Sequence, residues 1–316
     1  MQLTRGLKKS FKWLSGSLII ILFFLQGTGL INIALLTNLE GNAADLRMIS
    51  TLKGGVDERI VIVDIDEKSL TKYGQWPWNR HYLAELVDTL FQHYQIKVLG
   101  FDLVFAEPAG NQFSALEKEF KNRSDVSPQA KQALAFEALQ DAEFAKIISQ
   151  YPITLGIFFN QAENSQLNQL PPAISQLDSA TNTALSLPKP VGYTANLELF
   201  NNASSRSGFF DNPVVDRDGK FRRVPLFQSY QGQLFPSLAL SVAQQALDNP
   251  ELNIQMVQQG EYLAITSIQL GHRVVNTDQG GAVQIPFRGG EGSFPYISVA
   301  DILSHKTPLE QLEGKI

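Results

Sequence analysis

The chain has 316 residues, of which 44% are hydrophobic and 18% charged, a composition that indicates a globular protein and excludes a disordered one. Its net charge of -5 at pH 7 comes with no basic field, so nucleic acid is not an expected partner. There are no cysteines, which excludes disulfide bonds, thiol catalysis and cysteine-based zinc sites but does not decide the compartment.

The N-terminal residues predict a membrane anchor. An uncharged apolar stretch at residues 18–36 follows four basic residues: Arg5, Lys8, Lys9 and Lys12. Its 19 residues are about enough to cross a bilayer core of roughly 30 Å. A cleaved signal peptide is the alternative, but the stretch is long and no small-residue cleavage site follows it, which favours an uncleaved anchor. The basic residues place residues 1–17 in the cytoplasm, so residues 45–316 are expected to form one extracytoplasmic domain on the cell (inner) membrane.

Residues 60–108 predict a strand, a turn, a helix and a second strand. The apolar runs at residues 60–63 and 97–105 are short and rich in Val and Ile, as in strands that are buried on both faces. Asn79 is placed to cap the helix between them. Apolar residues recur in this helix at steps of three and four, which gives it one apolar face: Leu83, Leu86, Val87, Leu90, Phe91 and Tyr94. We therefore expect a right-handed βαβ unit with the two strands as neighbours.

The α/β pattern continues beyond this unit. A polar, insertion-like loop at residues 110–128 precedes a helix at residues 129–150. A third buried strand, at residues 153–159, extends the unit to βαβαβ. Residues 160–190 show little periodicity and predict a long surface excursion.

The second half of the chain is expected to be rich in strands. These strands are predicted at residues 208–210, 221–230, 263–270, 273–276 and 283–287. Hairpin-type turns are predicted at residues 218–219 and 279–281, and a helix at residues 237–247. A last helix begins at Ser298, with Asp301 at capping-box spacing. The predicted fold class is therefore α/β: an N-terminal transmembrane helix, then a mixed domain with a βαβαβ first part and a strand-rich second part.

Several separated motifs resemble one family. They are IVIVDIDEKSL, GQWPWNR, VLGFDLVFAEP, GFFDNPVVDRDGKFRRVPL, LFPSLALSVA, QIPFRGGEGSFPYISVADIL and LEGKI, and they occur in the same order as in the CHASE2 domain, an extracytoplasmic sensor module of bacterial receptors. The resemblance covers residues 60–316. In that family the equivalent of residues 314–316 begins another strand, and further membrane helices and a cytoplasmic output domain usually follow. The resemblance therefore implies that this chain ends in mid-fold and lacks its output domain.

The same resemblance implies a signalling partner. The output domain in this family is most often a nucleotide cyclase, such as an adenylate cyclase, and otherwise a protein kinase or a diguanylate cyclase. We expect the receptor to be a homodimer, since such cyclases place their catalytic sites between two chains. The ligand would be a small molecule or an envelope component, and no cofactor is expected.

Three carboxylates mark the first candidate ligand site. Asp64, Asp66 and Asp102 lie at or near the C-terminal ends of two strands that we expect to be neighbours, which is where open α/β sheets bind ligands. Such a group could hold a cation or an amine. For each residue alone, capping of a local turn is the favoured interpretation. Arg222 and Arg288 are the basic counterparts, which could hold an anion beside a Gly-rich turn or neutralise the acidic group.

A tryptophan-rich turn joins the first strand to its helix. Trp76 and Trp78 flank Pro77, and we expect both rings to be buried as a plug that holds the turn. Exposed, they would suit stacking or a membrane interface. No nucleotide-binding, hydrolase or metalloprotease motif is present, and the four histidines are too scattered for a metal site.

Three hypotheses of function follow. The first is a binding module without chemistry of its own, the sensory part of a membrane receptor. The second is a membrane-anchored, metal-dependent hydrolase that uses Asp64, Asp66 and Asp102, since paired carboxylates can hold a catalytic cation. The third is a structural envelope protein that scaffolds its partners.

Overall fold

The computed structural model describes residues 13, 16–18, 20–25, 34–109, 127–163, 165–259 and 262–316. The chain divides into two units, residues 1–53 with 217–220, and residues 54–216 with 221–316. Helix α2 (Ala34–Ser50) belongs to the first unit. No helix in the described part of the chain is long and apolar enough to cross a membrane. Several residues of the predicted anchor, among them 26–33, lie outside the described residues, as does most of the loop predicted at 110–128.

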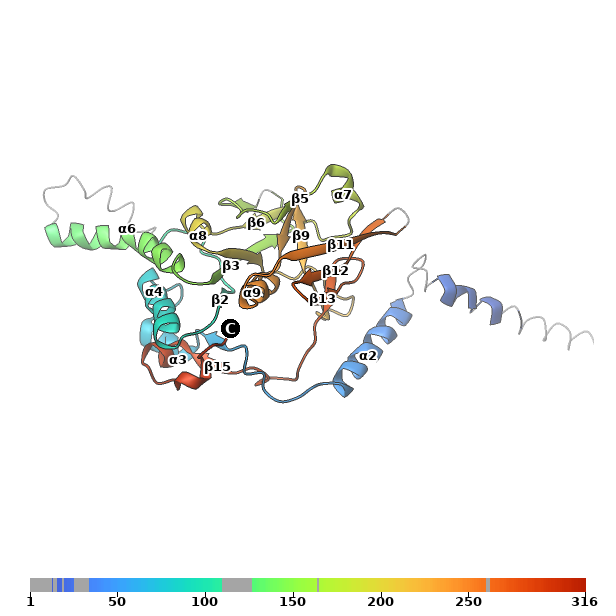
Figure 1. The fold of residues 1–316 in the computed structure, drawn as a ribbon, viewed down its shortest axis with the longest axis horizontal. Coiled ribbons are helices and arrows are strands. Elements are labelled where there is room, and N and C mark those ends of the chain that lie inside the picture. Colours follow the sequence, from blue (N-terminus) through green and yellow to red (C-terminus); the bar gives the residue numbers. More distant parts are fainter. Residues whose placement is uncertain are drawn as a thin grey trace, which may run out of the picture. The chain divides into compact units, whose positions relative to one another are not determined.

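The second unit is built around a sheet centred on β3 (Ile153–Asn160). This strand pairs in parallel with β2 (Leu99–Phe101) and with β7 (Arg206–Phe209), and antiparallel with β6 (Gly192–Thr194) (Figure 1). The edge strand β4 (Gln166–Leu167) pairs with β6. Helix α6 (Pro128–Ile148) connects β2 to β3, and most of β3 is buried, so the predicted helix and the parallel strands on either side of it are confirmed.

The first strand has a different neighbour from the predicted one. β1 (Ile62–Asp64) pairs in parallel with β15 (Tyr296–Ser298), not with β2. The C-terminal residues lie between the segments that lead into β1 and β2 (Figure 1). The Ile316 N–H donates to the Arg59 carbonyl at 3.0 Å, and the Lys97 N–H donates to the Lys315 carbonyl at 2.8 Å. The prediction that β1 and β2 are direct neighbours is therefore wrong, because apolar periodicity identifies a strand but not its partner.

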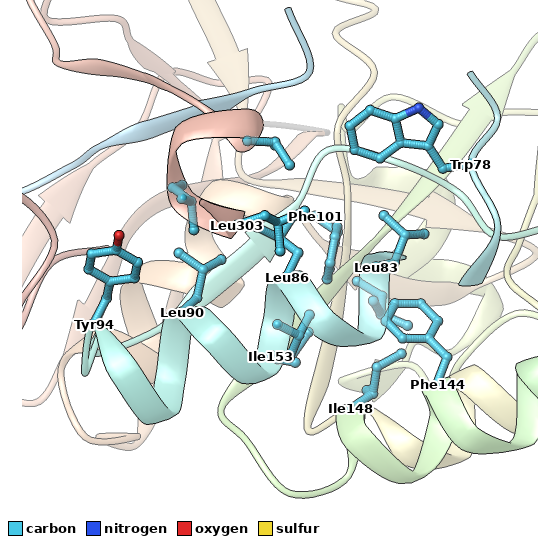
Figure 2. Close-up of a cluster of buried hydrophobic side chains, with 14 of the residues drawn as sticks. Trp78, Leu83, Leu86, Leu90, Tyr94, Phe101, Phe144, Ile148, Ile153 and Leu303 are labelled. Carbon is cyan, nitrogen blue, oxygen red and sulfur yellow. The ribbon is translucent and has the colours of Figure 1, made fainter. Parts of the chain in front are cut away.

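Helices pack around the main hydrophobic core of the second unit. They are α3 (Glu67–Tyr73), α4 (Arg80–Asp88), the π-helical turn η1 (Thr89–His93), α8 (Glu198–Ala203) and α10 (Val299–Leu303). Figure 2 shows the apolar face of α4 and η1, with Leu83, Leu86 and Leu90 pointing into the core. Phe144 and Ile148 of α6 meet this face (Figure 2). The predicted cap is confirmed, since the Asn79 side chain accepts a hydrogen bond from the His81 N–H at 2.9 Å.

The second half is rich in strands, as predicted. β8 (Arg223–Pro225) pairs with β14 (Ala282–Gln284). A second group is β5 (Ser175–Gln176), β10 (Gln233–Pro236) and β9 (Phe227–Tyr230). A third is β11 (Leu252–Gln259), β12 (Tyr262–Leu270) and β13 (Arg273–Asn276). The short elements between them are α7 (Ser179–Ala184), α9 (Leu238–Ala246) and η2 (Leu309–Gln311).

The hairpins lie elsewhere than predicted. The chain reverses at Gln231-Gly232 between β9 and β10, where both residues have positive φ of 51° and 79°. Residues 218–219 and 279–281 do form turns, but the strands on either side of each turn pair with other strands. The Gly-containing segments predicted these two turns correctly, but they did not indicate which strands pair.

Two further predictions need correction. The capping box at α10 is not formed, because Ser298 Oγ accepts from the Ala300 N–H while Asp301 pairs with Lys68. The predicted surface excursion contains β5 and α7, and three of its leucines are buried in a second hydrophobic core. These are Leu177, Leu185 and Leu187. Isolated leucines in a polar segment show no period, so periodicity could not reveal them.

Candidate ligand site

Asp66 joins the beginnings of two helices. It is the N-cap of α3, where its Oδ1 accepts from the Ser69 N–H at 2.9 Å and from the Ser69 hydroxyl at 2.7 Å. The same oxygen accepts from the Ser298 hydroxyl at 2.8 Å, at the start of α10. Burial alone would raise the pKa of Asp66, but the hydrogen bonds from Ser69 and Ser298 outweigh it and lower the pKa. The structure thus gives Asp66 a capping role.

Asp64 and Asp102 stand at the ends of β1 and β2. Both side chains are exposed, and Asp64 lies opposite Ser298 in the parallel register. Partial removal from water raises the pKa of Asp102. In the part of the chain that the structure describes, no three His, Asp or Glu side chains come together to hold a metal ion. A ligand site on Asp64 and Asp102 stays a prediction, and a hydrolase metal centre there has no support from the geometry.

Arg288 lies with a different carboxylate. Its Nη1 is 3.1 Å from Oδ2 of Asp57, which Arg59 also holds through a bond of 2.7 Å from Nη2. Asp57 is buried, and the hydrogen bond from Arg59, with the nearby charge of Arg288, holds the pKa of its carboxyl well below the usual range. Arg288 therefore holds the segment around Asp57, near the N-terminal end of the second unit.

The turn around Pro77 holds one buried tryptophan. Trp78 is buried, donates from Nε1 to the Gly74 carbonyl at 2.8 Å and packs edge-on against Tyr73. Trp76 is 38% exposed, so the prediction that both rings are buried is wrong for Trp76. The contacts of Trp78 are sufficient to hold the turn. The Trp76 ring lies partly on the surface.

Arg222 and Arg223 both bind Asp216, but they differ in burial. Arg222 is buried and donates from Nη1 to Oδ2 of Asp216 at 2.7 Å. Arg223 donates from Nη2 to the other oxygen of Asp216 and from Nη1 to Asp278, both at 2.8 Å. The hydrogen bonds from Arg222 and then Arg223 lower the pKa of Asp216, and the bond to Asp216 is the main cause of a raised pKa at Arg223.

A cavity of about 620 Å³ opens beside this ion pair. It is lined by Gln161, Ser186, Leu187, Pro188, Pro213, Val214, Arg223, Asp278, Gln279, Gly280 and Ala282. The Asp278 carboxylate is held in place because its Oδ1 accepts from the N–H groups of Gly280 and Ala282, each at 2.9 Å. A volume of this size is in the usual range for a small-molecule site.

The charged side chains of the cavity lining are Arg223 and Asp278. The lining contains no histidine, and its one carboxylate already accepts from Arg223 and from two backbone N–H groups. Arg222, the candidate from the sequence, lies beside the cavity in the ion pair with Asp216, whereas its neighbour Arg223 lines the cavity. Neighbouring residues of an extended segment point to opposite faces, and the sequence does not say which face meets the cavity.

Comparison with known proteins identifies the family. A protein-family model described as CHASE2 domain matches residues 16–316. No curated protein and no solved structure matches the chain.

Proposed function

The chain belongs to the CHASE2 domain family, the sensory extracytoplasmic modules of signalling receptors, and on this premise we propose that its second unit binds a small ligand and reports it across the membrane. The observation that carries the proposal is the cavity beside Arg223 and Asp278. A ligand there changes signalling only if it binds one of two receptor conformations more tightly than the other. The segments that meet at the cavity come from distant parts of the chain, so a ligand that contacts several of them can favour one arrangement.

The membrane topology is part of the proposal. Residues 18–36 form the anchor, residues 1–17 lie in the cytoplasm, and the domain at residues 45–316 lies outside it. The support is the sequence, with its uncharged apolar stretch after four basic residues, and the membership of the family.

The output is proposed to be an adenylate cyclase in a homodimeric receptor. This rests on family membership, because a sensor of this kind controls a cytoplasmic enzyme and cyclase sites form between two chains. In this proposal the sensor itself needs no catalytic group, and the two charged side chains of the cavity lining, Arg223 and Asp278, form an ion pair. A metal-dependent hydrolase is not carried by any specific observation.

Sequencing the gene downstream of the codon for Ile316 tests the output. We expect further apolar spans followed by a nucleotide cyclase domain. A protein kinase or a diguanylate cyclase in its place would overturn the cyclase assignment and leave the sensor role standing. A stop codon directly after Ile316 would overturn the assignment of an output domain to the same polypeptide.

A further inference from the structure

We infer that the cavity beside Arg223 and Asp278 binds a zwitterion of the α-amino-acid class. The inference rests on the proposed function, since it names the ligand of the same sensor. It is carried by the charges on the cavity wall, by the hydrogen-bonding capacity that these charges retain, and by the residues that complete the lining.

The charged side chains of the cavity lining balance each other before any ligand binds. They are one arginine, Arg223, and one aspartate, Asp278, which form an ion pair. A ligand with a net charge would leave one charge unmatched in a site that is partly removed from water, and such a charge is costly. A ligand that brings one positive and one negative group leaves the balance unchanged.

The ion pair itself has room for both ends of such a ligand. The side chains of Arg223 and Asp278 are 43% and 33% exposed, although they are in contact with each other. Two of the five N–H donors of the Arg223 guanidinium are used by Asp216 and Asp278, which leaves three for a ligand carboxylate. The Asp278 carboxylate accepts three bonds out of about four, which leaves one position for an ammonium group.

The spacing of the protein charges suits this class. Arg223 Nη1 and Asp278 Oδ2 are 2.8 Å apart, so the guanidinium and the carboxylate present adjacent surfaces to the cavity. In an α-amino acid the ammonium and the carboxylate are attached to the same carbon and are similarly adjacent. A guanidinium binds a carboxylate through parallel N–H donors, which adds a defined orientation to the charge attraction.

The remaining wall indicates where a side chain would lie. The apolar part of the lining is aliphatic, with no aromatic ring, and it consists of Leu187, Pro188, Pro213, Val214 and Ala282. Nucleobases are typically bound by stacking on aromatic rings, so this lining does not suit them. A volume of about 620 Å³ exceeds what the charged groups alone require and leaves space for an aliphatic side chain.

Calorimetric titration of the purified full chain with each of the twenty L-amino acids tests the inference. We expect at least one aliphatic amino acid to bind. Its N-acetyl derivative and its carboxamide should each bind at least tenfold more weakly, because each lacks one of the two charges. If no amino acid binds, or if both derivatives bind as well as the parent, the inference is wrong.

Variants locate the site. Arg223→Gln and Asp278→Asn should each weaken binding at least tenfold, whereas Arg273→Gln and Asp248→Asn, which make the same charge changes at exposed positions, should not. Because the first two substitutions also remove an ion pair, Ser186→Trp gives an independent result. It fills the cavity from an exposed lining position, keeps the ion pair, and should also weaken binding. Unchanged binding in Ser186→Trp would contradict the assignment of the site.

These outcomes are separate from those of the proposed function. Amino-acid binding by a domain that lies in the cytoplasm would leave the inference standing and overturn the sensor topology. A domain that lies outside the cytoplasm and binds no amino acid would overturn the inference alone.

Discussion

The carboxylate of Asp66 accepts a hydrogen bond of 2.8 Å from the hydroxyl of Ser298, a residue more than two hundred positions later in the chain. Asp66 follows β1 and Ser298 is the last residue of β15; these strands pair in parallel, and each residue caps the helix that comes after its strand. Ser69 completes the link, because its hydroxyl donates to Asp66 and accepts from the Ala300 N–H at 3.0 Å. The strand pair and the two helices are therefore joined by one small network of caps.

Removal of this cap should destabilise the domain. Asp66→Ala removes the acceptor for three donors, and we expect a loss of about 2 kcal/mol, at the upper end of the range for an N-cap. Urea denaturation followed by circular dichroism measures the loss. Asp64→Ala, two residues away on an exposed side chain, is the matched control and should change stability by less than about 0.5 kcal/mol. Equal effects of the two substitutions would contradict the capping role.

The buried arginine at the start of α4 should be essential for stability. Arg80 donates from Nε to Asp141 at 3.0 Å and from Nη2 to the Glu107 carbonyl at 2.8 Å, and its guanidinium lies over the Phe105 ring. Arg80→Gln leaves the Asp141 carboxylate without its cation, which costs roughly 3–5 kcal/mol for a buried pair.

An exposed ion pair provides the control for Arg80. Lys97 and Asp248 are 3.3 Å apart on the surface, and Lys97→Gln should cost less than about 1 kcal/mol. Both variants are compared by their free energies of unfolding in urea. A loss for Arg80→Gln no larger than that for Lys97→Gln would show that the buried pair does not hold the segment at Glu107.

The aromatic centre of the core gives a third prediction. Phe144 is fully buried, and its ring lies 5.3 Å from that of Phe105 and 5.5 Å from that of Phe200. Phe144→Ala should cost roughly 3–5 kcal/mol, because the transfer energy is lost and a cavity is left. Phe158→Ala, at a position that is 39% exposed, should cost clearly less. Thermal unfolding of the two variants tests this, and similar melting temperatures would contradict the assigned core.

Asp211 should make the domain less stable as the pH rises. Its oxygens accept from the Phe159 N–H at 2.8 Å and from Gln228 Nε2 at 2.7 Å, and no cation pairs with it among the described residues. Burial raises the pKa of Asp211 in spite of these bonds. A raised folded-state pKa means that the folded state holds the proton more tightly than the unfolded state. The stabilisation is therefore complete below the unfolded pKa of about 4 and is lost as the pH rises through the folded-state pKa.

Asp211→Asn isolates this contribution. The variant keeps an acceptor for Phe159 and removes the titration, so it should gain stability relative to the parent as the pH rises from 4 to 8. Urea midpoints at several pH values measure the difference between the two proteins, in which the contributions of other carboxylates cancel. Asp248→Asn, at an 83% exposed side chain, should show no such gain. A constant difference between parent and Asp211→Asn would contradict the raised pKa.

The sequence predicted local structure better than pairing. Steps of three and four apolar residues located α4 and its buried face, and the position of Asn79 located its cap, because both signals are local. The partner of β1 was not predictable, since β15 and residues 314–316 come from the far end of the chain. The apolar pattern of a strand does not indicate which other strand pairs with it.

The site was harder to predict than the fold. Arg222 and Arg223 have the same chemistry, and only the direction of each side chain separates a buried ion pair from a cavity wall. Asp278 did not stand out in the sequence, because an aspartate just before the turn at residues 279–281 is typical of a turn. Its second role, as the partner of Arg223, depends on the pairing of β8 with β14.

The most direct test of the sensor role is the side of the membrane on which the domain lies. Because the chain has no cysteine, one added cysteine is a unique label. We predict that Glu291→Cys, at an exposed position of the second unit, reacts with a membrane-impermeant maleimide in intact cells, whereas Gln2→Cys reacts only after the cells are lysed. Protection of Glu291→Cys until lysis would place the domain in the cytoplasm and contradict its role as an extracytoplasmic sensor.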